Sequence, residues 1–296
     1  MNFELQAYLQ ERKRLIDQSL DQYLPAEDRL PPKLSKAVRY SVLAGGKRIR
    51  PILLLAAYEV WKDDYLRALP FACALEMVHA YSLIHDDLPA MDDDDFRRGK
   101  PTSHKAFGEA MAILAGDALQ AEAFGLMARA GRDSFTPQQS LAAIRELADG
   151  AGLNGMAAGQ AMDMETQGRQ FGSEELEFIH SRKTGALIRA AVKVGAILAG
   201  ADEKSLRTFS EFGGRVGLAF QVADDVLDAV GGEKSGKAGG SDARKKKATY
   251  VGLFGLKQSQ DRAKTLVSES IELIKEYGTR AEPLRQIARF LAEREY

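Results

Sequence analysis

Residues 221–228 read Gln221-Val222-Ala223-Asp224-Asp225-Val226-Leu227-Asp228, with three carboxylates on an otherwise apolar segment. At about 100° per residue on a helical wheel, Gln221 and the three aspartates fall within an arc of about 100°. The valine, alanine and leucine side chains fill the arc from about 80° to about 240°, which predicts an apolar helix with one carboxylate stripe. Because unpaired buried charge is costly in free energy, this stripe needs a cationic partner.

A second acidic cluster runs from His85 to Asp95, and residues 86–95 include six aspartates. Pro89 disfavours helical geometry at the residue before it, so the helix entering from Phe71 is expected to end or kink near Asp87. Alone, such a run is commonly a solvated acidic loop. Two clusters together favour Mg²⁺, which takes oxygen ligands and is usually held by one or two carboxylates with substrate phosphates. Neither cluster has the histidine and cysteine spacing of a zinc site.

Helical spacing of apolar residues recurs along the whole chain, and strand alternation is hard to find. The predicted helical segments are 3–22, 33–44, 48–62, 68–87, 104–130, 138–166, 174–199, 203–230, 248–277 and 282–293. The breaks between them carry proline and glycine, and no linker rich in serine, glycine or proline divides the chain. We therefore expect one all-α domain over residues 1–296.

The composition excludes several classes of protein. The 41 Lys+Arg and 42 Asp+Glu give a net charge of −1, which argues against nucleic-acid binding. The single cysteine, Cys73, cannot form a disulfide within the chain and fits a reducing compartment. The N-terminus lacks the pattern of a signal peptide, so we expect a cytoplasmic protein. The most apolar long stretch, 185–200, contains Arg189 and Lys193, so no membrane span is expected.

Basic residues gather at four predicted helix ends or loops. They are Lys47, Arg48 and Arg50; Arg97, Arg98 and Lys100; Lys183; and Lys237 with 244–247. Each alone is an ordinary solvated charge, but together they indicate phosphate recognition, because arginine binds phosphate in a bidentate manner and lysine adds a point charge. Neither a P-loop nor a strand-linked GxGxxG motif is present, which disfavours a nucleotide site of those kinds.

Several motifs follow one another in a specific order. They are Gly-Gly-Lys-Arg-Ile-Arg-Pro (45–51), Asp-Asp-x4-Asp (86–92), Arg-Arg-Gly-Lys-Pro-Thr (97–102), Lys-Thr-Gly (183–185), Phe-Gln (220–221), Asp-Asp-x-x-Asp (224–228), Gly-Lys (236–237) and Lys-Ala-Thr-Tyr (247–250). Over essentially the whole chain, this order resembles the trans-isoprenyl diphosphate synthases, and most of all the bacterial farnesyl diphosphate synthases. The resemblance implies a homodimeric isoprenoid synthase fold, a single large helical bundle around a central cavity.

The resemblance also implies a role for individual residues. About three Mg²⁺ ions per site would be held by Asp86, Asp92 and Asp224, supported through water or charge by Asp87, Asp225 and Asp228. The residues implied to contact the allylic diphosphate are Arg97, Lys183, Lys237 and Lys247, and those implied for isopentenyl diphosphate are Lys47, Arg50, His79 and Arg98. Thr184 and Gln221 match groups beside the reacting carbons, and Gly46 permits close backbone approach. The glycines and bases of 231–247 suggest a loop that orders over substrate, although a permanently mobile surface loop has the same composition.

The implied reaction condenses dimethylallyl or geranyl diphosphate with isopentenyl diphosphate to give (E,E)-farnesyl diphosphate. The allylic diphosphate ionises, the isopentenyl double bond attacks the cation, and a proton is lost. In a helix, Ser82 and Tyr81 lie about 6 Å and about 7.5 Å from Asp86 along the axis. By resemblance these two side chains face the growing chain, and a large Tyr81 fits a C15 product. An ordinary core aromatic is the alternative for Tyr81.

Other functions fit the sequence less well. A geranylgeranyl diphosphate synthase would use the same chemistry with a deeper cavity. A non-catalytic subunit of a heteromeric synthase would typically have lost aspartates or diphosphate-binding bases, and none is lost here. A terpene cyclase would usually carry a different second metal motif, and a generic divalent-cation binder leaves Lys47, Lys183 and Lys247 unexplained.

Overall fold

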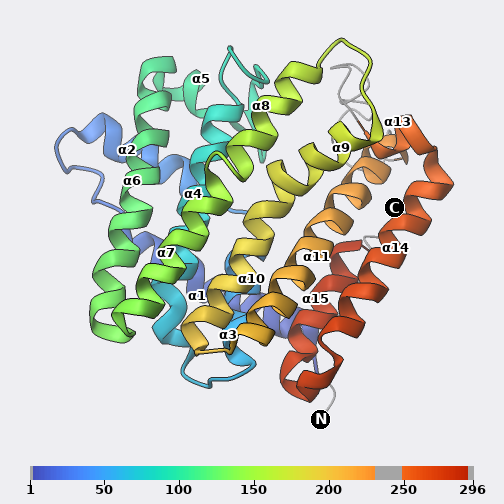
Figure 1. Ribbon diagram of the computed structural model, residues 1–296. Helices are drawn as coiled ribbons and strands as arrows, with labels where there is room; N and C mark the ends of the chain where they lie inside the picture. The colour runs from blue at the N-terminus through green and yellow to red at the C-terminus, as the bar shows by residue number, and fades with distance from the viewer. Residues whose placement is uncertain (1–2, 231–248, 293–296) are drawn as a thin grey trace.

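Helices dominate the computed structural model, which describes residues 3–230 and 249–292 (Figure 1). The α-helices are α1 (Leu5–Tyr23), α2 (Pro32–Val42), α3 (Ile49–Glu59), α4 (Leu69–Asp86), α5 (Ser103–Phe107), α6 (Glu109–Ser134), α7 (Pro137–Ala151), α8 (Met156–Thr166), α9 (Ser173–Ile179), α10 (Gly185–Ala199), α11 (Glu203–Val230), α13 (Tyr250–Phe254), α14 (Leu256–Leu273) and α15 (Glu282–Ala292). Shorter helical turns are η1 (Tyr65–Ala68), η2 (His180–Thr184) and η3 (Lys275–Ala281). The predicted all-α fold class is confirmed.

Three segments predicted as continuous helices are interrupted. The segment 104–130 divides into α5 and α6 at Gly108, and 248–277 divides into α13 and α14 at Gly255. These glycines have φ of +91° and +79°, a backbone region outside the right-handed helix. The segment 138–166 divides into α7 and α8 at 152–155. Apolar spacing continues across each break, so the periodicity alone did not predict the interruptions.

A small β-hairpin follows the first acidic cluster, where the sequence shows no strand pattern. Strand β1 (Phe96–Arg97) pairs antiparallel with β2 (Lys100–Pro101), and Arg97 lies opposite Lys100. The two turn residues, Arg98 and Gly99, both have positive φ, +53° and +75°. This is the geometry of a type I′ turn, the two-residue turn that matches the twist of paired strands. The hairpin holds the two adjacent arginines beside the C-terminal end of α4.

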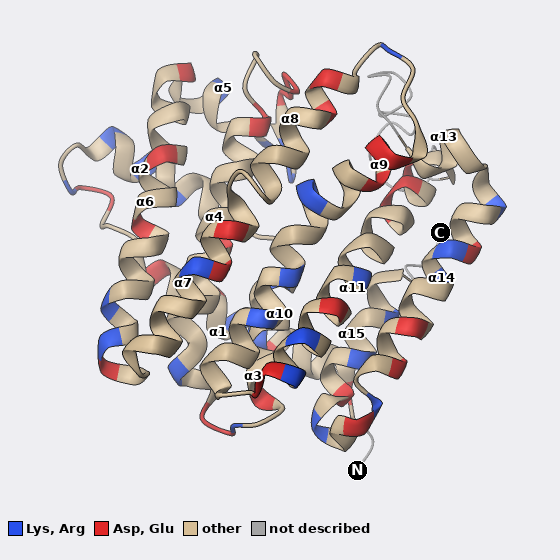
Figure 2. Ribbon diagram, in the orientation of Figure 1, with Lys and Arg blue, Asp and Glu red and all other residues tan. Residues whose placement is uncertain are grey.

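The core is built around α3, α4 and α10, whose side chains are largely buried. Helix α10 packs against α3, α7 and α11, and α4 packs against α6. Figure 1 shows that α4 and α11 both end at the upper end of the bundle, near α8 and α9. In Figure 2, acidic residues lie at the end of α11 and on the loops beside α8. The two acidic clusters are therefore at the same end of the molecule.

One helix in the described part of the chain, α6, has the length and composition of a membrane span, although the sequence prediction was that no such segment exists. Of its most apolar window, 39% is buried. The helix packs against α2, α4, α5 and α7. A core helix of a soluble protein meets the same criteria of length and composition, so α6 is weak evidence for a membrane protein.

Candidate active site

A cavity of about 500 Å³ opens beneath the first acidic cluster. Its walls come from the start of α3, the C-terminal half of α4, the loop after α4, α8 and η2. The predicted site residues that line it are Arg50, His79, Tyr81, Ser82, Asp86, Lys183 and Thr184. Met156, Ala157, Ala161 and Met164 of α8 add an apolar wall. The cavity thus joins charged groups to an apolar chamber.

Lys183 and Thr184 project from η2, a π-helical turn between α9 and α10. Such turns often occur at functional sites, because the extra residue changes the direction of the side chains. The ammonium group of Lys183 lies 2.7 Å from Asp163 Oδ2 of α8. Thr184 Oγ1 donates a hydrogen bond of 2.7 Å to Gln221 Oε1 on α11, so three helical elements meet at this wall.

Asp225 is a hydrogen-bonded hub behind this wall. The residue is 4% exposed and accepts hydrogen bonds from Gln221 Nε2 at 3.2 Å and from the backbone N–H of Tyr250 at 2.8 Å. His180 Nε2 lies 3.5 Å from the same carboxylate. Burial, together with the charge of Lys183, lowers the pKa of His180 to about 3, so the ring is neutral and this contact is not an ion pair. Asp225 therefore orients Gln221 and anchors the start of α13.

Asp87 is likewise engaged within the protein. The side chain is 4% exposed and accepts from Arg97 Nε at 2.7 Å and Nη2 at 2.5 Å. Arg97 also approaches Asp94, at 3.6 Å. Burial raises the pKa of Asp87, and the neighbouring guanidinium opposes that effect. The pair fastens the hairpin to the end of α4 and places Arg97 beside the acidic cluster.

Two of the arginines assigned to isopentenyl diphosphate, Arg50 and Arg98, lie near His79. Arg50 Nη1 lies 3.3 Å from His79 Nε2. Burial, followed by the charge of Arg50, lowers the pKa of His79 well below its usual value. The imidazole is therefore neutral, with Nε2 as acceptor and the proton on Nδ1. A smaller neighbouring pocket is lined by His79, Arg97 and Arg98.

The Gly45-Gly46 turn makes room for an arginine of the hairpin. Arg98 donates to the carbonyl of Gly45, and a Cβ atom at Gly46 would lie 2.8 Å from the Arg98 guanidinium. The close approach predicted at Gly46 is thus made by a side chain of this protein. Lys47, the next residue, is exposed.

The aspartates predicted to bind metal lie at the same end of the bundle. The loop after α4 folds back, so that the backbone N–H of Asp92 donates to the carbonyl of Asp86 at 2.9 Å. Asp224 is exposed near the C-terminal end of α11. Across residues 3–230 and 249–292, no three His, Cys, Asp or Glu side chains form a ready-made metal cluster. Lys237, Lys247 and the whole of the predicted 231–247 loop fall outside the described residues.

The sequence interpretation missed two residues of this site, Gln160 and Asp163 on α8. Neither amide atom of Gln160 has a hydrogen-bond partner among the described residues, although both are buried, and the side chain lines the cavity. Asp163 pairs with Lys183. Residues three apart share one helical face, so Gly159-Gln160-x-x-Asp163 was the available signal. An unpartnered buried amide is the kind of group that a polar ligand would satisfy.

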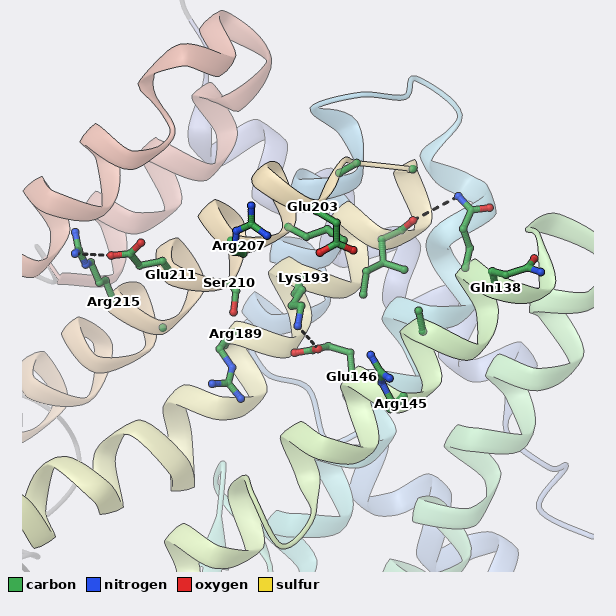
Figure 3. A pocket seen from close by; sticks show the side chains of 17 residues that line it. Gln138, Arg145, Glu146, Arg189, Lys193, Glu203, Arg207, Ser210, Glu211 and Arg215 are labelled. Carbon is green, nitrogen blue, oxygen red and sulfur yellow. Dashed lines mark hydrogen bonds and ion pairs between the residues drawn. The ribbon is translucent and has the colours of Figure 1, made fainter.

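A separate groove of about 780 Å³ lies between α7, α10 and α11 (Figure 3). Figure 3 shows Lys193 paired with Glu146, a contact of 2.6 Å. This groove includes the α10–α11 turn, at the end of α11 opposite the acidic cluster. None of the predicted site residues lines it, so the candidate active site is the cavity beneath Asp86.

Known proteins match the chain over most of its length. The family model "Polyprenyl synthetase" matches residues 31–287. The chain is 49% identical to a farnesyl diphosphate synthase of Geobacillus stearothermophilus over 87% of each chain. It is 46% identical to a geranylgeranyl diphosphate synthase of Cyanophora paradoxa, covering 99% of this chain and 97% of the other. A Helicobacter pylori geranyltransferase structure, complexed with magnesium and isoprenyl diphosphate, matches with 30% identity and a TM-score of 0.85 over 98% of this chain and 97% of the other.

Proposed function

The chain belongs to the polyprenyl synthetase family, and we propose that it is a Mg²⁺-dependent prenyltransferase that makes (E,E)-farnesyl diphosphate. Its substrates are isopentenyl diphosphate and the allylic dimethylallyl and geranyl diphosphates. The observation that carries the proposal is the cavity itself, which has Asp86, Arg50 and Lys183 at its polar part and Tyr81 with the α8 side chains along its apolar part. This arrangement suits a ligand with a diphosphate head and a hydrocarbon tail.

The donor set fits magnesium. Asp86, Asp92 and Asp224 offer the hard oxygen ligands that Mg²⁺ prefers. A ready-made cluster is unnecessary, because Mg²⁺ is commonly held by one or two carboxylates together with substrate phosphates and water. About three ions per site remain part of this proposal, with these aspartates as ligands. When bound, magnesium would neutralise the charge that develops on the leaving diphosphate.

The protein's own bases add to that stabilisation. Lys183 and Arg97 are held in place by Asp163 and Asp87, so their positive charges are already oriented before substrate binds. Lys237 and Lys247 are assigned to the same diphosphate. Arg50, His79, Lys47 and Arg98 are assigned to isopentenyl diphosphate. Neutral His79 can donate a hydrogen bond from Nδ1 without adding charge.

Thr184 is suited to the allylic cation. Its hydroxyl proton is engaged by Gln221 Oε1, which leaves the oxygen lone pairs as the part of the group that can face the cavity. Such a dipole, oriented before the reaction, favours positive charge on the neighbouring carbon. The apolar α8 wall excludes water that would otherwise capture the cation.

Product sizing tests this function. The purified chain is incubated with dimethylallyl diphosphate, isopentenyl diphosphate and Mg²⁺, and the dephosphorylated products are separated by chromatography. A C15 alcohol is expected. A C20 product would instead identify a geranylgeranyl diphosphate synthase, an activity named for one of the relatives. Absence of product until a second subunit is added would identify a non-catalytic subunit.

We also propose a homodimer formed through α6 and α7. Ile113 and Leu114 of α6 and Leu141 of α7 are 44%, 51% and 68% exposed. Large apolar side chains exposed on two neighbouring helices favour a contact site there, and a second copy in a two-fold arrangement is the commonest partner of a soluble enzyme. A cytoplasmic location is part of the same proposal, since the buried thiol of Cys73 suits a reducing compartment.

A further inference from the structure

Residues 45–50, here called the basic loop, carry Lys47, Arg48 and Arg50. The side chain of Arg48 faces the protein interior. Its guanidinium donates from Nε to Asp17 Oδ1 at 2.8 Å, from Nη1 to Glu76 Oε1 at 2.6 Å and from Nη2 to the carbonyl of Val42 at 2.7 Å. The side chain is 1% exposed, and that of Glu76 is 3% exposed. All three nitrogens are thus occupied by acceptors from α1, α4 and the end of α2.

The backbone at Arg48 is also unusual. The residue is the N-cap of α3 and has φ +53° and ψ +32°, the left-handed region. A residue with a Cβ atom rarely adopts that conformation, because the Cβ atom comes too close to the following carbonyl oxygen. The three side-chain hydrogen bonds hold the loop in this conformation, which fixes the direction in which α3 begins.

The neighbours of Arg48 are the bases assigned to isopentenyl diphosphate. Lys47 precedes it, and Arg50 is the second residue of α3. Its partner Glu76 is three residues before His79 on α4, so both side chains lie on one helical face. Arg48–Glu76 and Arg50–His79 therefore form two successive contacts between the loop and α4.

We propose that Arg48 is a positioning residue for the isopentenyl diphosphate pocket: it locks the loop that carries Lys47 and Arg50 onto α4, where His79 lies. The inference rests on the proposed prenyl transfer. Arg48 and Glu76 line the smaller pocket beside His79, but the Arg48 side chain is 1% exposed and its three nitrogens are all bonded to protein acceptors, so Arg48 acts by geometry. A buried ion pair adds little net stability compared with apolar residues of similar volume, which favours a role in specifying geometry.

The chain offers a matched control at the other end of α3. Arg12 of α1 is 6% exposed and donates to Glu59, the last residue of α3, at 2.5 Å. Both arginines therefore join α1 to α3 through a buried or half-buried carboxylate. Eleven residues of helix separate the two pairs by about 16 Å, so the Arg12 pair is remote from the basic loop.

The test compares Arg48→Lys with Arg12→Lys by steady-state kinetics and thermal unfolding. Lysine keeps the positive charge but lacks the planar guanidinium that donates hydrogen bonds in three directions at once. Arg48→Lys is expected to raise the KM for isopentenyl diphosphate about tenfold or more, because small displacements of binding groups are costly, while the KM for geranyl diphosphate changes less than about twofold. Arg12→Lys is expected to lower the melting temperature without changing either KM.

Equal changes in both KM values, or none, in a folded Arg48→Lys protein would overturn the positioning role. Should that variant fail to fold, Glu76→Gln supplies the same test, since it keeps the side-chain volume and removes the charge facing Arg48. Titration of isopentenyl diphosphate into the folded variant by calorimetry must then show weakened binding. A wild-type chain that makes no prenyl diphosphate would overturn the proposed function itself, whereas an active wild type with unaltered variants overturns only this inference.

Discussion

At the level of single residues, the two Asp-Asp pairs share one arrangement, in which the two aspartates of a pair have different surroundings. In each, the second aspartate is buried and hydrogen-bonded within the protein: Asp87 to Arg97, and Asp225 to Gln221 and Tyr250. The first of each pair lies at the cavity or on the surface, Asp86 lining the cavity and Asp224 exposed. Adjacent aspartates that look equivalent in the sequence therefore have different tasks, because the helix directs neighbouring side chains about 100° apart.

Substitutions should separate those tasks. Asp86→Ala and Asp224→Ala are expected to lower kcat by about a hundredfold or more, because each removes a group that stabilises charge developing in the transition state. Their melting temperatures should stay close to that of the wild type. Asp87→Ala should lower the melting temperature, since it leaves Arg97 without its buried partner, and should lower kcat less than the other two variants do, since Arg97 loses the contact that orients it. Turnover at saturating Mg²⁺ and thermal unfolding measure both effects.

Asp95→Ala is the matched control for these variants. Asp95 belongs to the same acidic run but pairs with Lys105 on the surface, at 2.8 Å. The turnover of Asp95→Ala should remain within about twofold of the wild type, since an exposed ion pair contributes little to the free energy of unfolding and its loss should leave the fold unchanged. Near-normal turnover in Asp86→Ala would contradict the assignment of that carboxylate.

His79 predicts a pH dependence of stability. Its pKa in the folded protein is well below 6.5, its usual value, because of burial and the charge of Arg50. Between the two pKa values the unfolded chain binds more protons at this residue than the folded one, so its contribution to stability is complete above 6.5 and declines as the pH falls below it. Denaturant unfolding at a series of pH values should show this decline, and His79→Gln should make it smaller.

An unchanged pH slope in the His79→Gln protein would show that this imidazole is not the titrating group. Activity gives an independent check. If His79 is neutral, the pH dependence of the KM for isopentenyl diphosphate near pH 6.5 contains no ionisation of this residue. The pH profiles of the wild type and of His79→Gln should therefore have the same shape near pH 6.5.

At the scale of elements, the sequence predicted the long helices well and their interruptions poorly. The segments 68–87 and 203–230 correspond closely to α4 and α11, because apolar spacing and glycine or proline boundaries agree there. The segment 174–199 is helical throughout but contains η2, and hydrophobic periodicity does not distinguish a π turn from an α turn. The pairing of Lys183 with Asp163 depends on tertiary contacts that no local pattern encodes.

Gly159 of α8 is the contact point with η2. A Cβ atom there would lie 2.1 Å from the backbone nitrogen of Lys183, so Gly159→Ala must displace one element from the other. We expect kcat to fall by about tenfold or more, since Lys183 and Thr184 move with η2. Kinetics on the folded variant test this expectation.

Gly214→Ala is its control, because a Cβ atom at that helical glycine meets no atom within 4 Å. This variant should be as active as the wild type and equally or more stable, given the higher helix propensity of alanine. Similar losses in both variants would mean that the Gly159 effect is not specific to η2.

At the scale of the whole molecule, the fold places both acidic clusters at one end and an apolar chamber below them. Tyr81 lines that chamber and is 9% exposed, and its ring packs on His85 in a T-shaped arrangement. Helical spacing predicted how far Tyr81 lies from Asp86 along α4 but could not predict the direction of its side chain. The packing of α4 against α6 and α8 against η2 decides which side of α4 faces the cavity.

Chain length should respond to that side chain. Tyr81→Ala is expected to yield prenyl products longer than C15, because it removes an aromatic ring from the path of the growing chain. Product chromatography measures the change. Tyr277→Ala, which removes a ring packed on Trp61 and Phe209 elsewhere in the bundle, should lower stability and leave product length unaltered. A C15 product from Tyr81→Ala would place the floor of the chamber at another residue.

The most direct test of the central claim is prenyl transfer by the wild-type chain itself. Geranyl diphosphate and isotopically labelled isopentenyl diphosphate are incubated with the purified protein, with Mg²⁺ or with excess chelator, and the labelled product is identified by chromatography. Labelled farnesyl diphosphate is expected to form, and only when Mg²⁺ is present. Failure of the folded protein to join the two substrates in the presence of Mg²⁺ would contradict the proposed prenyl transfer.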